Sequence, residues 1–129
     1  MRPGSKTFIA CLLFVALSGC DDVCSSEVLG TSRGPNGVVA RLEKKDCGAT
    51  VAYVYEVRTI DRDGANNIVL RFDDGHNTNW PSDDAKLMDV RWRGSALQLN
   101  VHVPVRVFKH LSAANGLTIM YGFAPGTEI

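Results

Sequence analysis

The sequence predicts an all-β protein: a small single-domain antiparallel sheet, folded as a sandwich or a partly open barrel of about seven strands. Segments in which apolar residues alternate with polar ones recur along the chain. Clusters of Gly, Asn, Asp and Pro separate them at the spacing of roughly 8–12 residues that is typical of such folds. After the N-terminal apolar run, no stretch shows helical periodicity. The length of 129 residues, with 45% apolar and 22% charged residues, suits one globular domain.

The expected strands follow one another in order, with turn residues between them. They span 38–45, 49–60, 68–72, 87–93, 96–103, 105–108 and 117–123. The segment 49–60 has the strongest strand signal, because its β-branched and aromatic residues suit a pleated surface. Pro35-Asn36-Gly37 and Gly94-Ser95 are typical turn sequences. The short segment 105–108, after Pro104, is expected at a sheet edge.

The chain is expected to divide into four parts. These are a signal peptide with a helical apolar segment (1–19), a tether with the first turn (20–37), the all-β domain (38–123) and a frayed tail (124–129). Arg2 and Lys6 begin the first part, before an apolar run of eleven residues at 7–17. A membrane-spanning helix needs about 20 apolar residues, so this shorter run fits an export signal.

The end of that signal, Leu17-Ser18-Gly19-Cys20, resembles the lipobox of bacterial lipoproteins. The resemblance implies cleavage before Cys20 and a diacylglycerol on its thiol, with palmitate among the acyl groups. Two or three acyl chains hold a protein firmly in a bilayer. We therefore expect a lipid-anchored protein of a bacterial cell membrane, facing the periplasm or the exterior. Asp21 resembles the signal for retention in the inner membrane.

Two of the four cysteines remain once Cys11 has left with the signal and Cys20 carries lipid. Cys24 and Cys47 are expected to form a disulfide, because disulfides persist in exported proteins. In the chain-entropy model this bridge would stabilise the fold by about 3 kcal/mol. The alternatives are two free thiols or a metal pair, and no Cys-x-x-Cys or nearby His supports a metal.

The surroundings of these cysteines resemble a family of small bacterial lipoproteins. That family combines a Cys near the lipid site, a Ser-Pro-Asp-Gly-like turn, a strand and Arg-Asp-Cys-Gly-Ala-Thr-Thr. The matching residues here are Cys24, Gly34-Pro35-Asn36-Gly37 and Lys45-Asp46-Cys47-Gly48-Ala49-Thr50. The family has no established activity, so the resemblance implies fold and location only.

Motifs for catalysis and metal binding are incomplete. Gly30-Thr31-Ser32-Arg33-Gly34 matches the nucleophile elbow Gly-x-Ser-x-Gly, but Pro35 stands where a helix should begin, so a turn is favoured. Asp61, Asp63 and Gly64 also favour a turn over a calcium loop, which needs more oxygen ligands. Asp73-Asp74-Gly75-His76 would need His102 or His110 to hold a metal. We expect no catalytic residues, no metal and no cofactor.

Three residues are candidates for binding. Asp46 and Thr50 flank Cys47 and form either a recognition loop or local caps, of which caps are favoured. Trp80 lies in a polar loop, where an exposed aromatic ring serves as a binding anchor. Alternatively, Trp80 folds back over an edge of the core.

These observations favour a lipid-anchored envelope protein of non-enzymatic function, a binding or structural module with an envelope protein as its partner. The alternative is an inhibitor or immunity-type protein that acts on an envelope hydrolase or toxin. The formal net charge is +0, so the sequence gives no basic field that would attract nucleic acid.

Replacing Cys20 by Ser should abolish lipid labelling and leave uncut precursor, because the acceptor thiol is lost. Labelling cells with a radioactive or clickable fatty acid, followed by intact-mass measurement, checks both effects. Labelling that persists in Cys20→Ser would place the lipid elsewhere.

Overall fold

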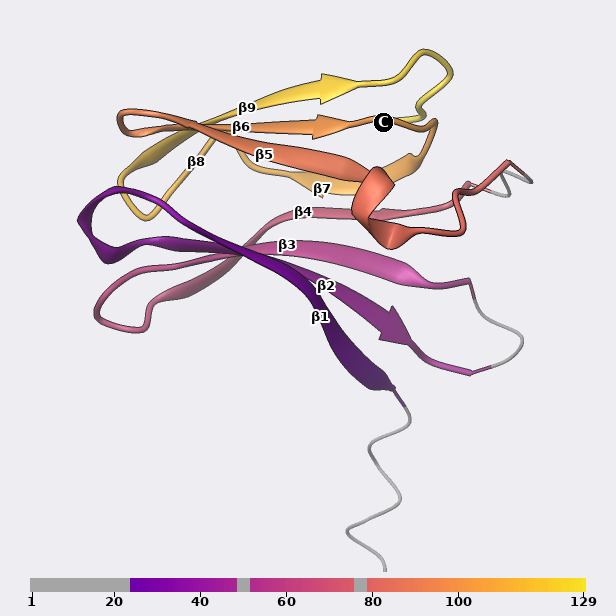
Figure 1. Cartoon of the computed structure of the whole chain (residues 1–129), viewed down its shortest axis with the longest axis horizontal. Coiled ribbons are helices and arrows are strands. Elements are labelled where there is room, and N and C mark those ends of the chain that lie inside the picture. Colours follow the sequence, from indigo (N-terminus) through magenta and orange to yellow (C-terminus); the bar gives the residue numbers. More distant parts are fainter. Residues whose placement is uncertain (1–23, 49–51, 76–78) are drawn as a thin grey trace, which may run out of the picture.

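The computed structural model describes residues 24–48, 52–75 and 79–129, and there the chain forms two β-sheets packed face to face (Figure 1). The all-β prediction is confirmed. Both sheets have free edges, so the fold is a sandwich and not a closed barrel. The expected signal peptide, Cys20 and Thr50 lie outside these ranges. Among the described residues, no helix has the length and apolar character needed to cross a membrane.

The five-stranded sheet has the order β1-β2-β3-β4-β7, and all its pairs are antiparallel. Its strands are β1 (Ser25–Arg33), β2 (Val39–Asp46), β3 (Val54–Ile60), β4 (Asn66–Asp73) and β7 (Arg106–His110). A short 3-10 turn, η1 (Pro35–Gly37), joins β1 to β2. Asn36 and Gly37 adopt positive φ there, as the predicted Pro-Asn-Gly turn requires.

The four-stranded sheet has the order β5-β6-β9-β8. It consists of β5 (Met88–Arg93), β6 (Ala96–Val101), β8 (Ala113–Ala114) and β9 (Leu117–Phe123), with the 3-10 turn η2 (Asp84–Lys86) before β5. The expectation of a purely antiparallel sheet is wrong at one pair, because β6 and β9 run parallel. The chain leaves β6, forms β7 in the other sheet and then returns beside β6, which makes this pair a crossover.

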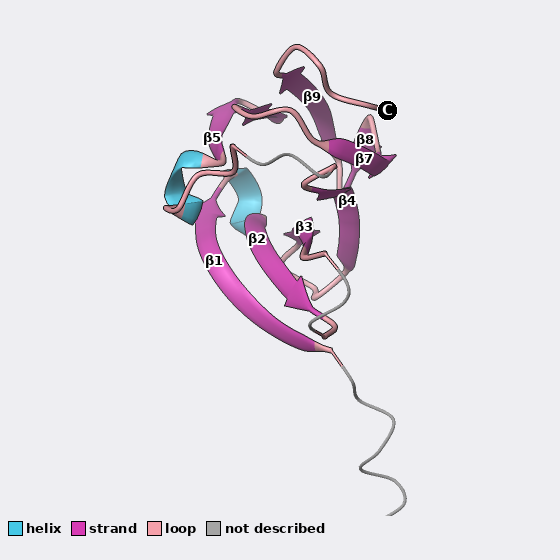
Figure 2. Ribbon diagram, turned by 90° about the vertical axis from the view of Figure 1, so that its right-hand side faces the viewer, coloured by secondary structure: helices cyan, strands magenta, loops and turns pink. Residues whose placement is uncertain are grey.

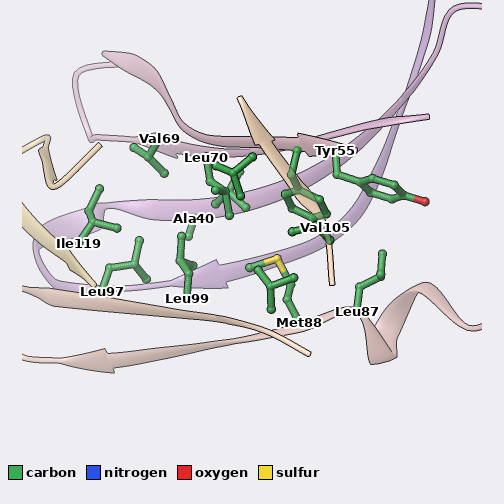
Figure 3. Close-up of a cluster of buried hydrophobic side chains, with 14 of the residues drawn as sticks. Ala40, Tyr55, Val69, Leu70, Leu87, Met88, Leu97, Leu99, Val105 and Ile119 are labelled. Carbon is green, nitrogen blue, oxygen red and sulfur yellow. The ribbon is translucent and has the colours of Figure 1, made fainter. Parts of the chain in front are cut away.

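The core lies between the sheets and takes side chains from both (Figure 3). β6 alternates as predicted, with Leu97, Leu99 and Val101 buried. β4 instead buries two consecutive residues, Val69 and Leu70. The register between β3 and β4 shifts at this point, so Val69 is an extra residue whose side chain also turns inward.

Residues 25–33 form the nine-residue strand β1, so the prediction of a tether there is wrong. β1 is an edge strand of polar residues that are mostly exposed, and it therefore lacks the alternation that marks a half-buried strand. Two constraints hold it: its pairing with β2 and the Cys24–Cys47 disulfide, with an S–S distance of 2.08 Å. The predicted bridge is confirmed.

The prediction of a frayed tail at 124–129 is also wrong. The amide of Val107 donates to the carbonyl of Glu128 at 2.7 Å, and the amide of Glu128 donates to the carbonyl of Val105 at 2.9 Å. β7 is the edge strand that was expected, and the tail supplies partners for its free backbone groups.

Two side chains of the β8–β9 region tie the sheets together. The Tyr121 hydroxyl lies 2.9 Å from the carbonyl of Val69 in β4 and 2.6 Å from that of Leu111. The Asn115 side chain accepts hydrogen bonds from Thr59 in β3 at 2.6 Å and from Asn67 in β4 at 2.9 Å.

Burial raises the pKa of Tyr121 to about 12, whereas an unfolded tyrosine titrates near 10. Below about pH 10 both states keep the proton. Between about pH 10 and 12 the unfolded state loses it first, so the free energy of unfolding should fall as pH rises, by up to about 1.4 kcal/mol per pH unit. Urea unfolding across this range should show a smaller slope for Tyr121→Phe than for the natural chain. Equal slopes would contradict the assignment.

Candidate functional site

An apolar groove opens where the free edges of the two sheets face each other. β1 and β5 lie on the same side of the molecule (Figure 2), and a cavity of about 240 Å³ lies between them. Its lining is mainly apolar and comes from both layers: Leu29, Leu42 and Val57 from one sheet, and Ala85, Met88 and Val90 from η2 and β5.

A bulge in β1 shapes this groove. The register passes from Val28 opposite Glu43 to Gly30 opposite Leu42, so Leu29 is an extra residue and reaches the core. Gly30 shares the inward face with Leu42, since directly opposed residues point to the same side. A Cβ atom placed on Gly30 would meet nothing within 4 Å. Part of the open volume therefore results from the missing side chain of Gly30.

Trp92 contacts Ser32, one of the residues that line the groove. Its indole N–H donates to the Ser32 hydroxyl in β1 at 2.9 Å. A Cβ placed on Gly34 would lie 2.5 Å from two ring carbons of Trp92, so only glycine lets the ring lie here. Ser32 therefore lies in strand β1, where its hydroxyl accepts a hydrogen bond. The turn that was favoured over a nucleophile elbow at 30–34 begins only at Gly34, so Thr31 and Ser32 are not part of it.

A cluster of charged and aromatic groups includes Asp84, which also lines the groove. The Lys44 ammonium lies 3.6 Å from the Asp84 carboxylate and 4.2 Å from the centroid of the Tyr53 ring. The Asp83 side chain accepts a hydrogen bond from the Ala85 amide at 3.0 Å and thereby caps η2. The groove therefore combines a mainly apolar lining with a few polar side chains, an arrangement common to binding sites.

Trp80 lies apart from the groove and packs over an edge of the core. It is half-buried, and its ring centroid is 5.5 Å from that of Tyr55. Its indole N–H donates to the Tyr55 hydroxyl at 3.3 Å. Burial raises the pKa of Tyr55, and this hydrogen bond partly offsets the rise. These contacts agree with the alternative that Trp80 folds back over an edge of the core.

Asp46 caps the turn after β2, because its carboxylate accepts a hydrogen bond from the Gly48 amide at 3.1 Å. The favoured turn at Asp61 is present as well, with its carboxylate accepting from the amides of Asp63 and Ala65 at 3.0 and 2.9 Å. The hydrogen bond from Ala65 is the main cause that lowers the pKa of Asp61.

The residues considered for a metal site lie in separate contacts. Asp73 pairs with Arg106, and His110 packs edge-on against Tyr121. His76 lies outside the described residues. In the described ranges 24–48, 52–75 and 79–129, no three His, Cys, Asp or Glu side chains are grouped so as to hold a metal ion.

A histidine–carboxylate pair lies beside a shallow depression of the four-stranded sheet. His102 is 2.7 Å from Asp89, which also accepts hydrogen bonds from Arg91 and Asn100. Partial desolvation raises the pKa of Asp89, but these hydrogen bonds and His102 lower it overall. Such a pair needs a nucleophile to catalyse acyl transfer, and neither Arg91 nor Asn100 is one.

No family model, no curated protein and no solved structure matches this chain. The resemblance to the small lipoprotein family therefore remains an expectation from the sequence.

The sequence reasoning missed the groove. Leu29 and Gly30 lie inside the segment 20–37 that is predicted as a tether, and Met88 and Val90 lie in the expected strand 87–93, where nothing in the sequence marks a groove. The usable signal is Val28-Leu29-Gly30, two adjacent apolar residues followed by glycine in an otherwise polar segment, because glycine inside a strand often marks a bulge.

Gly34→Ala should lower the free energy of unfolding by about 1–3 kcal/mol, because the added methyl group displaces the Trp92 ring. Gly30→Ala is the matched control. Its φ is not positive and its side chain meets no atom within 4 Å, so we expect no loss, or a gain of up to about 1 kcal/mol. Urea unfolding of both variants checks this, and equal losses would contradict the packing described for Trp92.

Proposed function

We propose that this protein is a lipid-anchored binding module of the cell envelope and that the groove between β1 and β5 is its binding site. The lipobox at Cys20 supports the anchor. The observation that carries the binding role is the apolar cavity between two sheet edges.

The size of the groove favours a small occupant. Sites for cofactors and drug-sized ligands usually enclose about 300–1,000 Å³. The cavity here, at about 240 Å³, is smaller and suits one or two apolar side chains. Its ligand is therefore an apolar part of a larger partner.

The strand edges favour an extended partner. Among the residues that the structure describes, β1 and β5 each have one neighbouring strand, so the backbone N–H and C=O groups on the other side of each strand pair with no strand of the two sheets. An extended segment can add to such an edge through backbone hydrogen bonds and place alternate side chains in an adjacent pocket. We infer that the ligand is an extended segment of an envelope protein, with an apolar side chain seated against Leu29 and Met88.

The test fills the groove from one of its walls. Gly30→Leu places a branched side chain in the open space, and Thr118→Leu adds the same side chain at an exposed position of β9. Each full-length variant is used to capture partners from an envelope extract, with quantitative mass spectrometry and a melting curve as a folding control.

Gly30→Leu should reduce capture of the main partner by about tenfold or more, equivalent to about 1.4 kcal/mol, whereas Thr118→Leu should retain it. Equal capture by the two variants would exclude the groove. If the partner is one stoichiometric hydrolase or toxin that loses activity on binding, the protein is an inhibitor or immunity-type protein that uses this groove.

A further inference from the structure

The outer face of the five-stranded sheet, which points away from the other sheet in Figure 1, carries an ordered array of charges. Paired residues form a row across all five strands: Val28, Glu43, Glu56, Arg71 and Lys109. Opposed residues point to the same side, so the row lies on one face. We call this surface the outer face.

The carboxylates of the outer face lie beneath its cations. Glu56 contacts Lys45 and Arg58, each at 3.1 Å, and Arg71 at 2.6 Å. The Glu56 side chain is 2% exposed, whereas that of Arg71 is 40% exposed. Burial alone would raise the pKa of Glu56, but the hydrogen bonds from Arg71 and Lys45 lower it overall. The ionised carboxylate therefore holds exposed cations in place.

The two neighbouring strands, β2 and β4, repeat this arrangement of a buried carboxylate beneath an arginine. Glu43 contacts Arg41 at 2.9 Å and Arg58 at 3.2 Å. Asp73 pairs with Arg106 and is itself buried. In each case the carboxylate is hidden and the guanidinium group remains partly exposed.

The outer face has an excess of positive charge. It carries seven cationic side chains against four carboxylates, which leaves three positive charges in excess: Arg33, Arg41, Lys45, Arg58, Arg71, Arg106 and Lys109 against Glu43, Glu56, Asp73 and Glu128. The whole chain has 14 basic and 14 acidic residues, so the rest of the chain is correspondingly acidic. The molecule is electrically polarised toward this face.

Exposed apolar side chains stand at both margins of the outer face. Val28 in β1 is 54% exposed and Phe108 in β7 is 53% exposed. The Arg106 guanidinium lies 5.0 Å from the centre of the Phe108 ring. Basic residues flanked by exposed apolar ones are typical of surfaces that lie in the interface of a bilayer.

We propose that the outer face lies against the headgroups of an anionic phospholipid bilayer and orients the domain on the membrane. The proposal rests on the membrane anchor of the proposed function. Four residues span at most about 14 Å, so an anchor at Cys20 keeps Cys24 and the start of β1 close to the bilayer. This orientation leaves the groove, on the opposite side of β1, open to a partner.

The test compares amine modification in nanodiscs of phosphatidylcholine alone and of an equimolar mixture with phosphatidylglycerol. The purified full-length protein is incorporated, and acetylation rates are measured by peptide mass spectrometry. Lys109 reports on the outer face, and Lys86, exposed on η2, is the internal control.

In discs that contain phosphatidylglycerol, Lys109 should react about fivefold more slowly than in discs of phosphatidylcholine alone. This factor corresponds to the attraction expected between one basic residue and an anionic surface. Lys86 should react equally in both. In 1 M salt, where the Debye length is about 3 Å, the protection should disappear.

Arg41→Gln with Arg71→Gln should remove most of the protection of Lys109, whereas Arg41→Lys with Arg71→Lys should keep it. Melting curves confirm that both double variants are folded. Equal Lys109 rates in the two lipids, or protection unchanged in the glutamine variant, would overturn the proposal.

Measuring the intact mass of the purified protein distinguishes the outer-face proposal from the proposed lipid anchor at Cys20. Lipidated protein with unprotected Lys109 overturns the outer-face proposal alone. Protein that carries no lipid but still protects Lys109 on anionic discs supports the outer face and refutes the anchor.

Discussion

The pairing of β1 with β2, closed by the Cys24–Cys47 bridge, is the constraint on which both proposed surfaces depend. β1 contributes little to the core, because most of its residues are exposed. Chain ends that are not tied down tend to fray, and here the disulfide and the backbone ladder oppose fraying. Without β1 the groove would lose the wall that carries Leu29 and Gly30, and Glu43 would lose the hydrogen bond from Ser26.

The two surfaces are opposite faces of one pair of strands. Residues alternate between faces along a strand, so β2 can direct Leu42 toward the groove and Arg41 toward the outer face. The bulge at Leu29 interrupts this alternation and puts both Leu29 and Gly30 on the groove side, while Val28 lies on the outer face. This local irregularity therefore gives the groove two consecutive residues of one strand.

The alternation of apolar and polar residues predicted the strands that have one buried face. It failed where pairing, a disulfide or contacts between distant strands determine the structure. β6 and β9 were predicted because Leu97, Leu99 and Ile119 are large and regularly spaced. β1 was not predicted, because its pairing with β2 and the disulfide stabilise it and burial of its side chains does not. The parallel β6–β9 pair was not predicted, because the order of strands in a sheet leaves no signal in the local sequence. Glu43 and Glu56 lie on the polar faces of the expected strands 38–45 and 49–60, where alternation alone predicts exposure. Their burial under arginines depends on contacts from three strands, which no spacing within one segment reveals.

The most direct test of this account is amide hydrogen exchange of β1 in the oxidised protein. The β1 amides that pair with β2 should be protected nearly as well as those of β2. When Cys24 and Cys47 are replaced by serine, protection should fall first at the Cys24 end. Exchange of the oxidised β1 at the rate of an unstructured chain would mean that this segment is a tether, and neither the groove nor the outer face would exist in the form described.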